Sequence, residues 1–399
     1  MDQCAACLGA RSPVFGQSIK RLLILLVLVF LAWPGLAQER TMMPVSVDGE
    51  QVRLAVITYK PTGAGPFPTL IFHHGSTGSG TDPSRFSRTF DPGVLAYWFV
   101  ARGWAVVLPS RRGRGGSEGL YDEGFSRIRA SGYTCDSELS LRGSDRALRD
   151  IDAITESVLA LPFVDRTRFV VGGQSRGGIL SVAWAGKHPD EPRGVINFVG
   201  GWLGAGCPTG SVVNQQLFKL GAGFPRPTLW LYGDNDPFYP LSHSQANFDA
   251  FRQAGGKGTF HEIGRGTAMN GHQIFTADDA WSAIVAAYLR ELGLPYTDLT
   301  AVRRQATDDE IRAAFVGKTV DFAPRGAIVV YRPDGRYEFT LPASGSTPGR
   351  SSEGVYWIEK GEICFESSAG VRRCDKIMKV DDAFHFIDAS GGQYPAQIR

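Results

Sequence analysis

The sequence lacks a surplus of charge of either sign. Its 399 residues include 42 Lys and Arg against 40 Asp and Glu, a net charge of +2. This balance argues against a protein that binds nucleic acid. The sequence also contains no run of acidic residues of the kind that forms a solvated tail. Glycine and proline are frequent, but they are spread among turns rather than gathered in low-complexity tracts. The sequence also lacks internal repeats, which excludes a solenoid.

No apolar run in the sequence is long enough to span a membrane. The run LLILLVLVFLAW follows Lys20 and Arg21 and is about a dozen residues long, whereas a spanning helix needs about 20. The small-residue pattern PGLA comes next, so residues 1–37 are expected to be a signal peptide that is cleaved after Ala37. An uncleaved signal anchor is the alternative. We predict a periplasmic or secreted protein with no stable membrane anchor after cleavage.

Cysteine is scarce, and its positions bear on the redox compartment. Of six cysteines, Cys4 and Cys7 would be removed with the signal peptide. The remaining four contain no C-x-x-C pair, which disfavours a zinc site. An even number in an exported protein indicates disulfides, and three pairings are possible. Proximity in the sequence favours Cys364–Cys374, which leaves Cys135–Cys207.

Between about residues 45 and 295, strand-like and helix-like segments alternate regularly. FPTLIFHHG, WAVVLPSRRG, RFVVGG, GVINFVGGW and PTLWLYGD are short apolar runs typical of strands. Apolar residues at helical spacing lie between or after them, at residues 93–103, 140–161, 177–188, 242–254 and 277–292. This alternation predicts an α/β domain over 45–295, with a mostly parallel, doubly wound sheet and helices on both faces.

After residue 295 the pattern changes to that of a small β domain. TDDEIRAAFVGKTV (307–320) predicts one short helix, and later strand-like runs are broken by Pro-Asp-Gly, Lys-Gly-Glu and Ala-Gly. We predict an antiparallel meander over 300–399. It contains no nucleophile motif and no metal-ligand spacing, so a binding or stabilising role is expected.

The stretch Gly173-Gln174-Ser175-Arg176-Gly177 fits the pattern G-x-S-x-G. It follows a predicted strand and precedes a predicted helix, the context in which this motif exposes a serine nucleophile on a strained turn. The pentapeptide alone is equally compatible with a serine N-cap on a glycine turn.

Two further strand ends carry the partners that a serine nucleophile needs. GDND follows the strand LWLY, and Gly271-His272 follows GTFHEIG (258–264), the last predicted strand. In a doubly wound sheet these ends meet at one edge, and the order Ser, Asp, His is the one that this architecture uses.

With these residues the chain resembles the α/β-hydrolase superfamily, and within it the dienelactone hydrolase-like and related serine esterases. The resemblance covers about residues 45–295. It rests on His74-Gly75-Ser76 with Gly78, RGRGGSEG (112–119), Gly173–Gly178, Gly233–Asp236 and Gly271-His272. Dienelactone hydrolases themselves have a cysteine nucleophile, so Ser175 departs from that narrower group.

The resemblance assigns roles residue by residue. Ser175 is the expected nucleophile and His272 the general base and acid. The resemblance favours Asp236, the last residue of G-x-x-D, over Asp234 as the acid that orients the imidazole. The oxyanion hole is expected from the backbone N–H groups of Ser76 and Arg176. His73, His74, His243 and His261 are not expected to be catalytic, and His74 is expected to brace the turn.

Several arginine and aromatic residues could set substrate specificity, but each could also have a purely structural role. Arg111, Arg112 and Arg114 could attract a substrate carboxylate, or they could pair with nearby acidic residues of the protein. The side chain of Arg176 could have either of the same two roles. Trp202, Phe238 and Tyr239 could line a substrate pocket or simply fill the core. Residues 204–227 have the composition of a lid, which a Cys135–Cys207 bridge would tie to the loop after the arginine strand.

The sequence therefore predicts an exported serine hydrolase that cleaves a small-molecule carboxylic ester without metal or organic cofactor. No nucleic-acid partner is expected. A peptidase or amidase, or a binding protein on an inactive hydrolase fold, are the alternatives.

Overall fold

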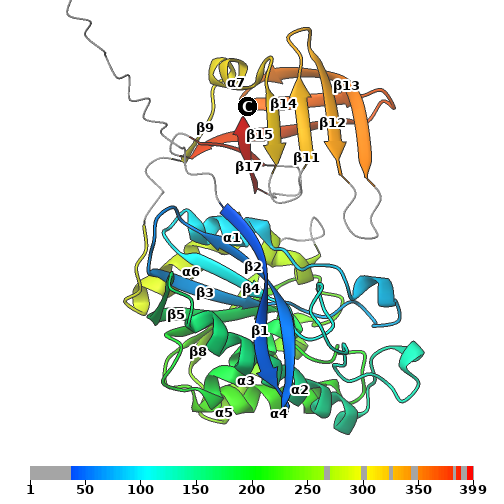
Figure 1. Cartoon of the computed structure of the whole chain (residues 1–399), viewed down its shortest axis with the longest axis vertical. Helices are drawn as coiled ribbons and strands as arrows, with labels where there is room; N and C mark the ends of the chain where they lie inside the picture. The colour runs from blue at the N-terminus through cyan, green and yellow to red at the C-terminus, as the bar shows by residue number, and fades with distance from the viewer. Residues whose placement is uncertain are drawn as a thin grey trace, which may run out of the picture. The chain divides into compact units, whose positions relative to one another are not determined.

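The computed structural model describes residues 37–264, 270–297, 303–322, 327–342, 349–380, 383–387 and 393–398. The predicted signal peptide lies outside the described residues apart from Ala37, and Cys4 and Cys7 lie outside them too. The described strands form two sheets (Figure 1). No described helix has both the length and the apolar character needed to cross a bilayer.

The first sheet is mostly parallel and contains the strands from the first two thirds of the described chain. These are β1 (Ala37–Val47), β2 (Glu50–Lys60), β3 (Phe67–His73), β4 (Ala105–Pro109), β5 (Val164–Gln174), β6 (Gly194–Phe198), β7 (Thr228–Gly233) and β8 (Gly258–Ile263). Their spatial order is β1-β2-β4-β3-β5-β6-β7-β8. The β1–β2 and β2–β4 pairs are antiparallel, and the other neighbouring pairs are parallel. The carboxyl ends of β3, β5, β6, β7 and β8 therefore meet at one edge.

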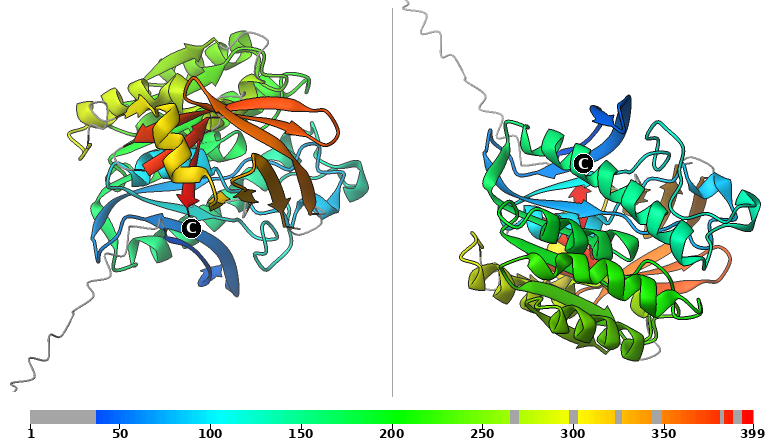
Figure 2. Two further views of the ribbon diagram at one scale, coloured as in Figure 1. Left: turned by 90° about the horizontal axis from the view of Figure 1, so that it is seen from above. Right: turned by 90° about the horizontal axis from the view of Figure 1, so that it is seen from below.

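Helices cover both faces of this sheet (Figure 2). They are α1 (Gly93–Val100), α2 (Ser137–Leu159), α3 (Arg176–Lys187), α4 (Gly210–Leu220), α5 (Leu241–Gln253) and α6 (Asp278–Glu291). The first and last of these pack on each other, while α2, α3, α4 and α5 contact one another in succession. Because both faces are covered, β4, β6 and β7 are buried at every position. The predicted α/β class with a mostly parallel sheet is confirmed.

Strand β1 begins before the boundary at residue 45 that the sequence predicts. Residues 37–47 pair with β2 along their whole length, across a turn in which Asp48 has a φ of 55°. The strand is an exposed edge except for Val45 and Val47, so it has no continuous apolar run to announce it.

The second sheet is antiparallel and closes on itself. Its strands are β9 (Arg303–Gln305), β10 (Thr319–Phe322), β11 (Ala327–Tyr331), β12 (Arg336–Leu341), β13 (Arg350–Glu359), β14 (Glu362–Ser367), β15 (Arg372–Val380), β16 (Ala383–Ile387) and β17 (Gln393–Ile398). Each strand from β10 to β16 pairs with the next along the chain, and β17 pairs with β10. The predicted antiparallel β fold is confirmed.

Helix α7 (Asp308–Phe315) is shorter than the helix that the sequence predicts over residues 307–320. Its start is fixed by a capping box, in which Thr307 and Glu310 each bond to the other's backbone N–H. It ends at Phe315 because Gly317 adopts a φ of 77°, and the next apolar residues enter β10. Phe315 and Ile311 are fully buried in the core of the second sheet.

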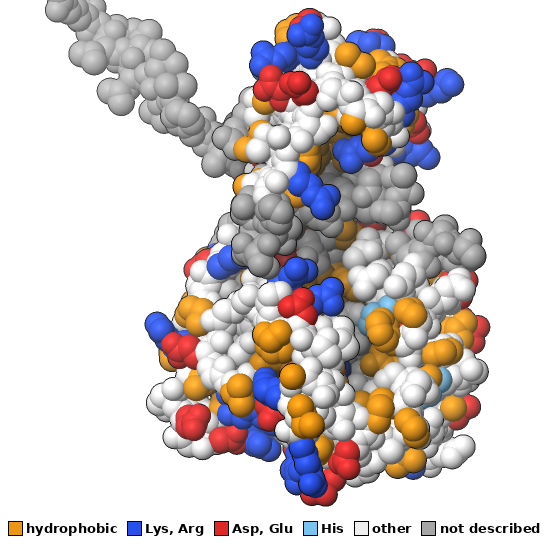
Figure 3. Space-filling model, turned by 90° about the vertical axis from the view of Figure 1, so that its right-hand side faces the viewer, with side chains coloured by type: hydrophobic (Ala, Val, Ile, Leu, Met, Phe, Trp, Pro, Cys, Tyr) orange, Lys and Arg blue, Asp and Glu red, His pale blue; other side chains and the backbone are white. Residues whose placement is uncertain are grey.

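The surface carries charges of both signs. On the face in Figure 3, Lys and Arg side chains are interspersed with Asp and Glu rather than forming one continuous basic area. On this face, the mixture of charges matches the balanced composition of the sequence.

Candidate active site

Ser175 occupies a strained turn between β5 and α3. Its backbone has a φ of 57° and a ψ of −121°, a combination that a residue with a side chain adopts only when its surroundings enforce it. The turn is tight enough that a Cβ on Gly173 would overlap Gly177, and one on Gly177 would overlap the carbonyl group of His73. The two glycines of the motif are therefore required by close backbone approach.

The turn places backbone donors beside Ser175. Arg176 is the first residue of α3, so its N–H has no intrahelical acceptor and points out of the helix start. On the other side, a Cβ on Gly75 would lie 3.0 Å from Ser175 Cβ, so the loop after β3 runs against the turn. Ser76 follows in that loop. The two residues predicted for an oxyanion hole thus lie on either side of Ser175.

Asp236 and His272 form a buried pair at the same sheet edge. Asp236 Oδ2 lies 2.9 Å from His272 Nδ1, and the Asp236 side chain is fully buried. Its Oδ1 accepts hydrogen bonds from the N–H groups of Phe238 at 2.8 Å and Tyr239 at 3.0 Å. The backbone N–H of His272 donates to Asn270 Oδ1 at 2.9 Å. These bonds fix the carboxylate and leave one of its oxygens for the imidazole.

Two aromatic rings hold the imidazole in place. The ring of Phe238 lies edge-on to His272 with centroids 4.8 Å apart, and the ring of Tyr239 lies 5.5 Å away. Phe238 is 46% exposed whereas Tyr239 is buried. Phe238 is thus available to a ligand, and Tyr239 belongs to the interior of the site.

One pocket brings most of the predicted site residues together. Its lining includes Ser76, Ser175, Arg176, Trp202, Phe238, Tyr239 and His272. Asp236 lies behind His272, out of reach of a ligand. The rival acid Asp234 follows the same strand, but Asp236 is the acid whose oxygen lies within hydrogen-bond distance of His272 Nδ1.

A buried ion cluster supports the two loops that flank Ser175. Glu123 lies 2.5 Å from Arg111 Nε and 3.6 Å from Arg176 Nη1, and all three side chains are at most 3% exposed. Burial alone would raise the pKa of Glu123, but the arginines reverse this and lower it, so the group is ionised. Arg111 also donates to the carbonyl of His74 at 3.0 Å. Burial and the Arg111 charge hold the pKa of His74 well below its usual value, so this histidine is neutral and braces the loop.

The side chain of Arg176 is held by the protein itself. Its guanidinium donates to the carbonyls of Glu123 at 2.7 Å and Trp202 at 3.3 Å. It lies between the rings of Tyr133 and Trp202, at 3.8 and 4.2 Å from their centroids. These contacts favour the structural reading of this side chain, with its N–H left for the oxyanion.

Arg112 does not line the pocket, in contrast to the prediction. Its Nε lies 2.5 Å from Asp150 and its Nη2 2.9 Å from Asp48. Both acids are distant in sequence, and the local acids Glu118 and Asp122 are not its partners. The arginine therefore connects α2 and the β1–β2 turn to the loop after β4.

Arg114 lines the pocket instead. It is 5% exposed, and its Nε has no hydrogen-bond partner among the described residues. Its Nη1 lies 3.5 Å from the Gly75 carbonyl, and its guanidinium lies 5.1 Å from the ring centroid of Tyr121. Of the charged residues described in the pocket lining, five are arginines (Arg40, Arg85, Arg88, Arg114 and Arg176) and one is an acid, Asp91. Because Arg40 pairs with Asp91 and Arg176 with Glu123, the excess of positive charge rests on Arg85, Arg88 and Arg114.

Sequence reasoning missed a chain of hydroxyl groups beside the pocket. The Tyr133 hydroxyl lies 2.9 Å from Thr77 Oγ1 and 2.5 Å from the Tyr121 hydroxyl, which donates to Glu123 at 3.2 Å. The aromatic content of residues 121–133 was the available signal, but the contacts depend on how that loop folds back on itself.

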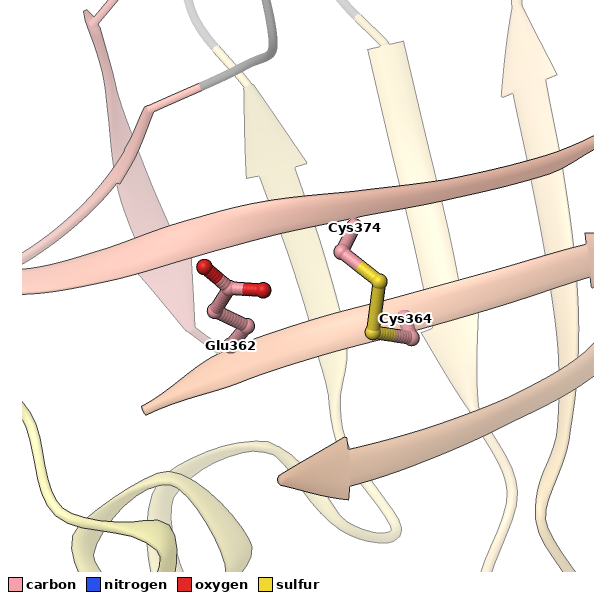
Figure 4. Close-up of side chains that lie close together, drawn as sticks. All are labelled: Glu362, Cys364 and Cys374. Atoms are coloured by element: carbon pink, nitrogen blue, oxygen red, sulfur yellow. A yellow bond between two sulfur atoms is a disulfide. The ribbon is translucent and has the colours of Figure 1, made fainter. Parts of the chain in front are cut away.

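Both disulfides favoured by sequence proximity are present. Cys135–Cys207 joins the loop before α2 to the loop before α4, and Cys364–Cys374 joins the paired strands β14 and β15. Glu362 lies next to the second bridge (Figure 4), within 4.8 Å of both sulfurs. Because the sulfurs are bonded to each other, they are not the thiolates that a metal requires.

Part of the chain matches a known protein family. The sequence profile of the X-Pro dipeptidyl-peptidase (S15) family matches residues 48–140, which end before Ser175. No curated protein matches the chain.

Several solved structures are similar at low identity. The esterase Pf2001 of Pyrococcus furiosus is 13% identical with a TM-score of 0.43, over 64% of this chain and 90% of that one. Est1E of Butyrivibrio proteoclasticus with bound ferulic acid is 15% identical with a TM-score of 0.42, over 63% and 98%. An acetyl xylan esterase of Paenibacillus sp. R4 is 16% identical with a TM-score of 0.44, over 66% and 90%. No substrate is inferred from likenesses at this level.

Proposed function

We propose that the chain is a member of the α/β-hydrolase superfamily and an exported serine hydrolase that cleaves carboxylic esters through Ser175, His272 and Asp236. One observation carries the proposal. Ser175 has the strained backbone of a nucleophile turn, and it lines the same pocket as an imidazole that a buried carboxylate orients.

In the proposed acylation step, His272 Nε2 takes the proton of Ser175 as the serine oxygen attacks the ester carbonyl carbon. The oxyanion that forms is stabilised by the N–H groups of Ser76 and Arg176, each worth about 3 kcal/mol. Asp236 stays ionised and stabilises the imidazolium. That imidazolium then gives its proton to the leaving alcohol.

In the second step, water attacks the acyl-enzyme with His272 as base, and the acid leaves as the proton returns to Ser175. Every group in this scheme belongs to the protein, so the proposed reaction uses no metal or organic cofactor.

Labelling with a fluorophosphonate probe tests the nucleophile. The wild type should label on the peptide that contains Ser175, and Ser175→Ala should not label. Ser181→Ala is the matched control, because Ser181 lies on α3 and is buried with its hydroxyl bound to the Gly177 carbonyl at 2.7 Å. If the wild type fails to label, the chain is a binding protein on an inactive hydrolase fold.

The second candidate is the same chemistry on an amide, which the S15 profile match favours. Comparison of p-nitrophenyl esters with aminoacyl p-nitroanilides separates the two. A kcat/KM for the anilides that equals or exceeds that for the esters would assign the chain to the peptidases.

We also infer that the ester carries a negative charge. The buried Arg114, whose Nε has no hydrogen-bond partner among the described residues, and the arginine excess of the pocket support a carboxylate on the substrate, since a carboxylate oxygen would accept from that donor. The wild type should cleave p-nitrophenyl hemisuccinate at least tenfold faster, in kcat/KM, than the neutral p-nitrophenyl pentanoate. Arg114→Met should remove this preference, and Arg142→Met, which removes an exposed arginine of α2, should keep it.

Export is tested on the mature protein. Amino-terminal sequencing of secreted material should begin at Gln38, and non-reducing peptide maps should recover both disulfides. A chain that retains Met1 and free thiols would refute this part of the proposal.

A further inference from the structure

Tyr239 reaches the nucleophile from the side opposite the expected oxyanion hole. It follows Asp236 by three residues at the end of β7, whereas Ser76 comes from the loop after β3. Strands β3 and β7 lie on opposite sides of β5, which carries Ser175. A group from the β7 side therefore faces a different part of the reacting centre than Ser76 does.

The ring of Tyr239 is held tightly in this position. Its N–H is bound to Asp236 Oδ1 at 3.0 Å, and its ring lies 5.5 Å from that of His272. On its other side the ring fills the space above Gly201, where a Cβ would overlap it. The Gly201 N–H donates to the Ser175 carbonyl at 3.2 Å. The ring thus spans from the proposed triad acid to the nucleophile turn.

The hydroxyl at the far end of the ring is next to Ser175. Tyr239 and Ser175 line the same pocket, and interactions with the Arg176 charge and the Ser175 side chain lower the pKa of the phenol, against the larger effect of burial. Burial raises the pKa of Tyr239 to about 12. The phenol therefore keeps its proton at any pH at which the enzyme folds, and it remains a hydrogen-bond donor throughout a reaction cycle.

We propose that the Tyr239 hydroxyl is a fourth catalytic group, which donates a hydrogen bond to the oxygen of Ser175. This proposal rests on the proposed function, because it takes Ser175 as the nucleophile. In the proposed arrangement the Ser175 hydroxyl donates a hydrogen bond to His272 while its oxygen accepts one from Tyr239, which aligns the oxygen for attack.

The same bond assists both chemical steps. As His272 removes the serine proton, negative charge grows on the serine oxygen, and the phenol stabilises it without giving up its own proton. In deacylation the serine oxygen is the leaving group. The phenol then stabilises its departure until the imidazolium returns the proton, so that no net proton passes through Tyr239.

Tyr239→Phe tests the hydroxyl alone, since the ring that packs on His272 and over Gly201 is retained. We expect kcat for a p-nitrophenyl ester to fall about tenfold to a hundredfold, the usual effect of a hydrogen bond to a charged atom. KM should stay within about twofold because the bond acts on the nucleophile and not on substrate binding. The rate constant of fluorophosphonate labelling should fall by a similar factor.

Tyr232→Phe is the matched control. Tyr232 is a buried tyrosine of β7 whose hydroxyl donates to the Gly200 carbonyl at 2.7 Å, away from the nucleophile. Its loss should lower the unfolding midpoint and leave kcat and labelling unchanged.

The outcomes separate this inference from the proposed function. A wild type that neither labels nor cleaves esters would defeat the proposed function itself. An active wild type with a Tyr239→Phe variant of equal kcat would overturn the role of the hydroxyl alone. A Tyr239→Phe variant without a cooperative unfolding transition would also count against it, because packing would then be the function of Tyr239.

Discussion

A carboxylate behind an imidazole can act only if it is held in the correct orientation. The neighbours of Asp236 provide this, since two backbone N–H groups bind one of its oxygens and His272 Nδ1 lies 2.9 Å from the other. The same local sequence offers Asp234 as a rival, two residues earlier. A pair of substitutions at these positions therefore separates the two acids.

Asp236→Asn should lower kcat by about a thousandfold or more, because an amide donates to His272 Nδ1 and leaves the imidazole in the wrong tautomer. KM should change little. Asp234→Asn, measured on the same ester, should keep kcat within about threefold. The reverse ranking of the two variants would transfer the role to Asp234.

His73 is a buried histidine whose ring nitrogens have no hydrogen-bond partner among the described residues, and it should make stability depend on pH. Burial and the nearby Arg111 lower its pKa to about 3 in the folded protein, against about 6.5 in an unfolded chain. The unfolded state therefore binds more protons between these values, so stability falls as the pH falls. At pH 4 the loss from this residue is about 3 kcal/mol.

Chemical unfolding at pH 7 and pH 4 measures this effect. His73→Leu should lose less stability on acidification than the wild type does. The partly exposed strand residue His261 supplies the control, and His261→Leu should follow the wild type. Parallel pH curves for wild type and His73→Leu would show that the acid sensitivity arises elsewhere.

At the residue scale, the sequence predicted positions better than partners. The motif around Ser175, the G-x-x-D pattern that ends at Asp236 and the Gly271-His272 pair are local signals, and each follows a strand. The partners of Arg112 are Asp150 and Asp48, which lie 38 and 64 residues away. No local pattern distinguishes that pairing from a solvated arginine or one that binds substrate.

At the scale of elements, the Arg112–Asp150 pair connects a loop to a helix rather than adding much stability. Burial raises the pKa of Asp150 even though Arg112 lies 2.5 Å away, so the cost of desolvation exceeds the attraction. Removing one partner of such a pair destabilises the fold strongly, whereas replacing both partners with apolar residues costs little stability.

Asp150→Leu should therefore lower the free energy of unfolding by about 3–5 kcal/mol, because it leaves Arg112 buried without its main counter-ion. The double variant Arg112→Met/Asp150→Leu should recover most of that loss. Asp48→Asn should lower the free energy of unfolding less than Asp150→Leu does, since the Asp48 side chain is one-third exposed. Denaturant midpoints rank the variants, and a double variant as unstable as Asp150→Leu would contradict the argument.

The elements themselves were largely predictable, and the exceptions have physical reasons. Apolar runs announce β3, β4, β6 and β7 because both faces of these strands are covered. Strand β1 lacks such a run because it lies at an edge and depends on β2 for its conformation. The last apolar residues of the predicted 307–320 helix belong to β10, since Gly317 ends α7.

At the scale of the whole molecule, the sequence predicted a meander after residue 295 but not its closure. Turn residues between successive strands announce each hairpin. The pairing of β10 with β17 joins segments about 75 residues apart through three residue pairs, which no local signal specifies. Closure removes the exposed edges of a sheet, and this makes an independently folding unit physically reasonable.

We therefore propose that residues 303–399 fold without the α/β part. Their core has its own aromatic and aliphatic cluster around Phe315, Tyr331 and Ile363, and the Cys364–Cys374 bridge crosslinks two adjacent strands of the ring. About 100 residues with a closed sheet and a disulfide are enough for a stable domain.

Expression of residues 303–399 and 38–297 as separate chains tests the boundary. The smaller chain should give the circular dichroism of a β protein and one cooperative thermal transition. The larger should keep fluorophosphonate labelling at Ser175, because Asp236, His272 and the flanking loops all lie within it. A smaller chain that is unfolded on its own would place its stability in contacts with the rest of the protein, and the 300–399 domain would have to be abandoned.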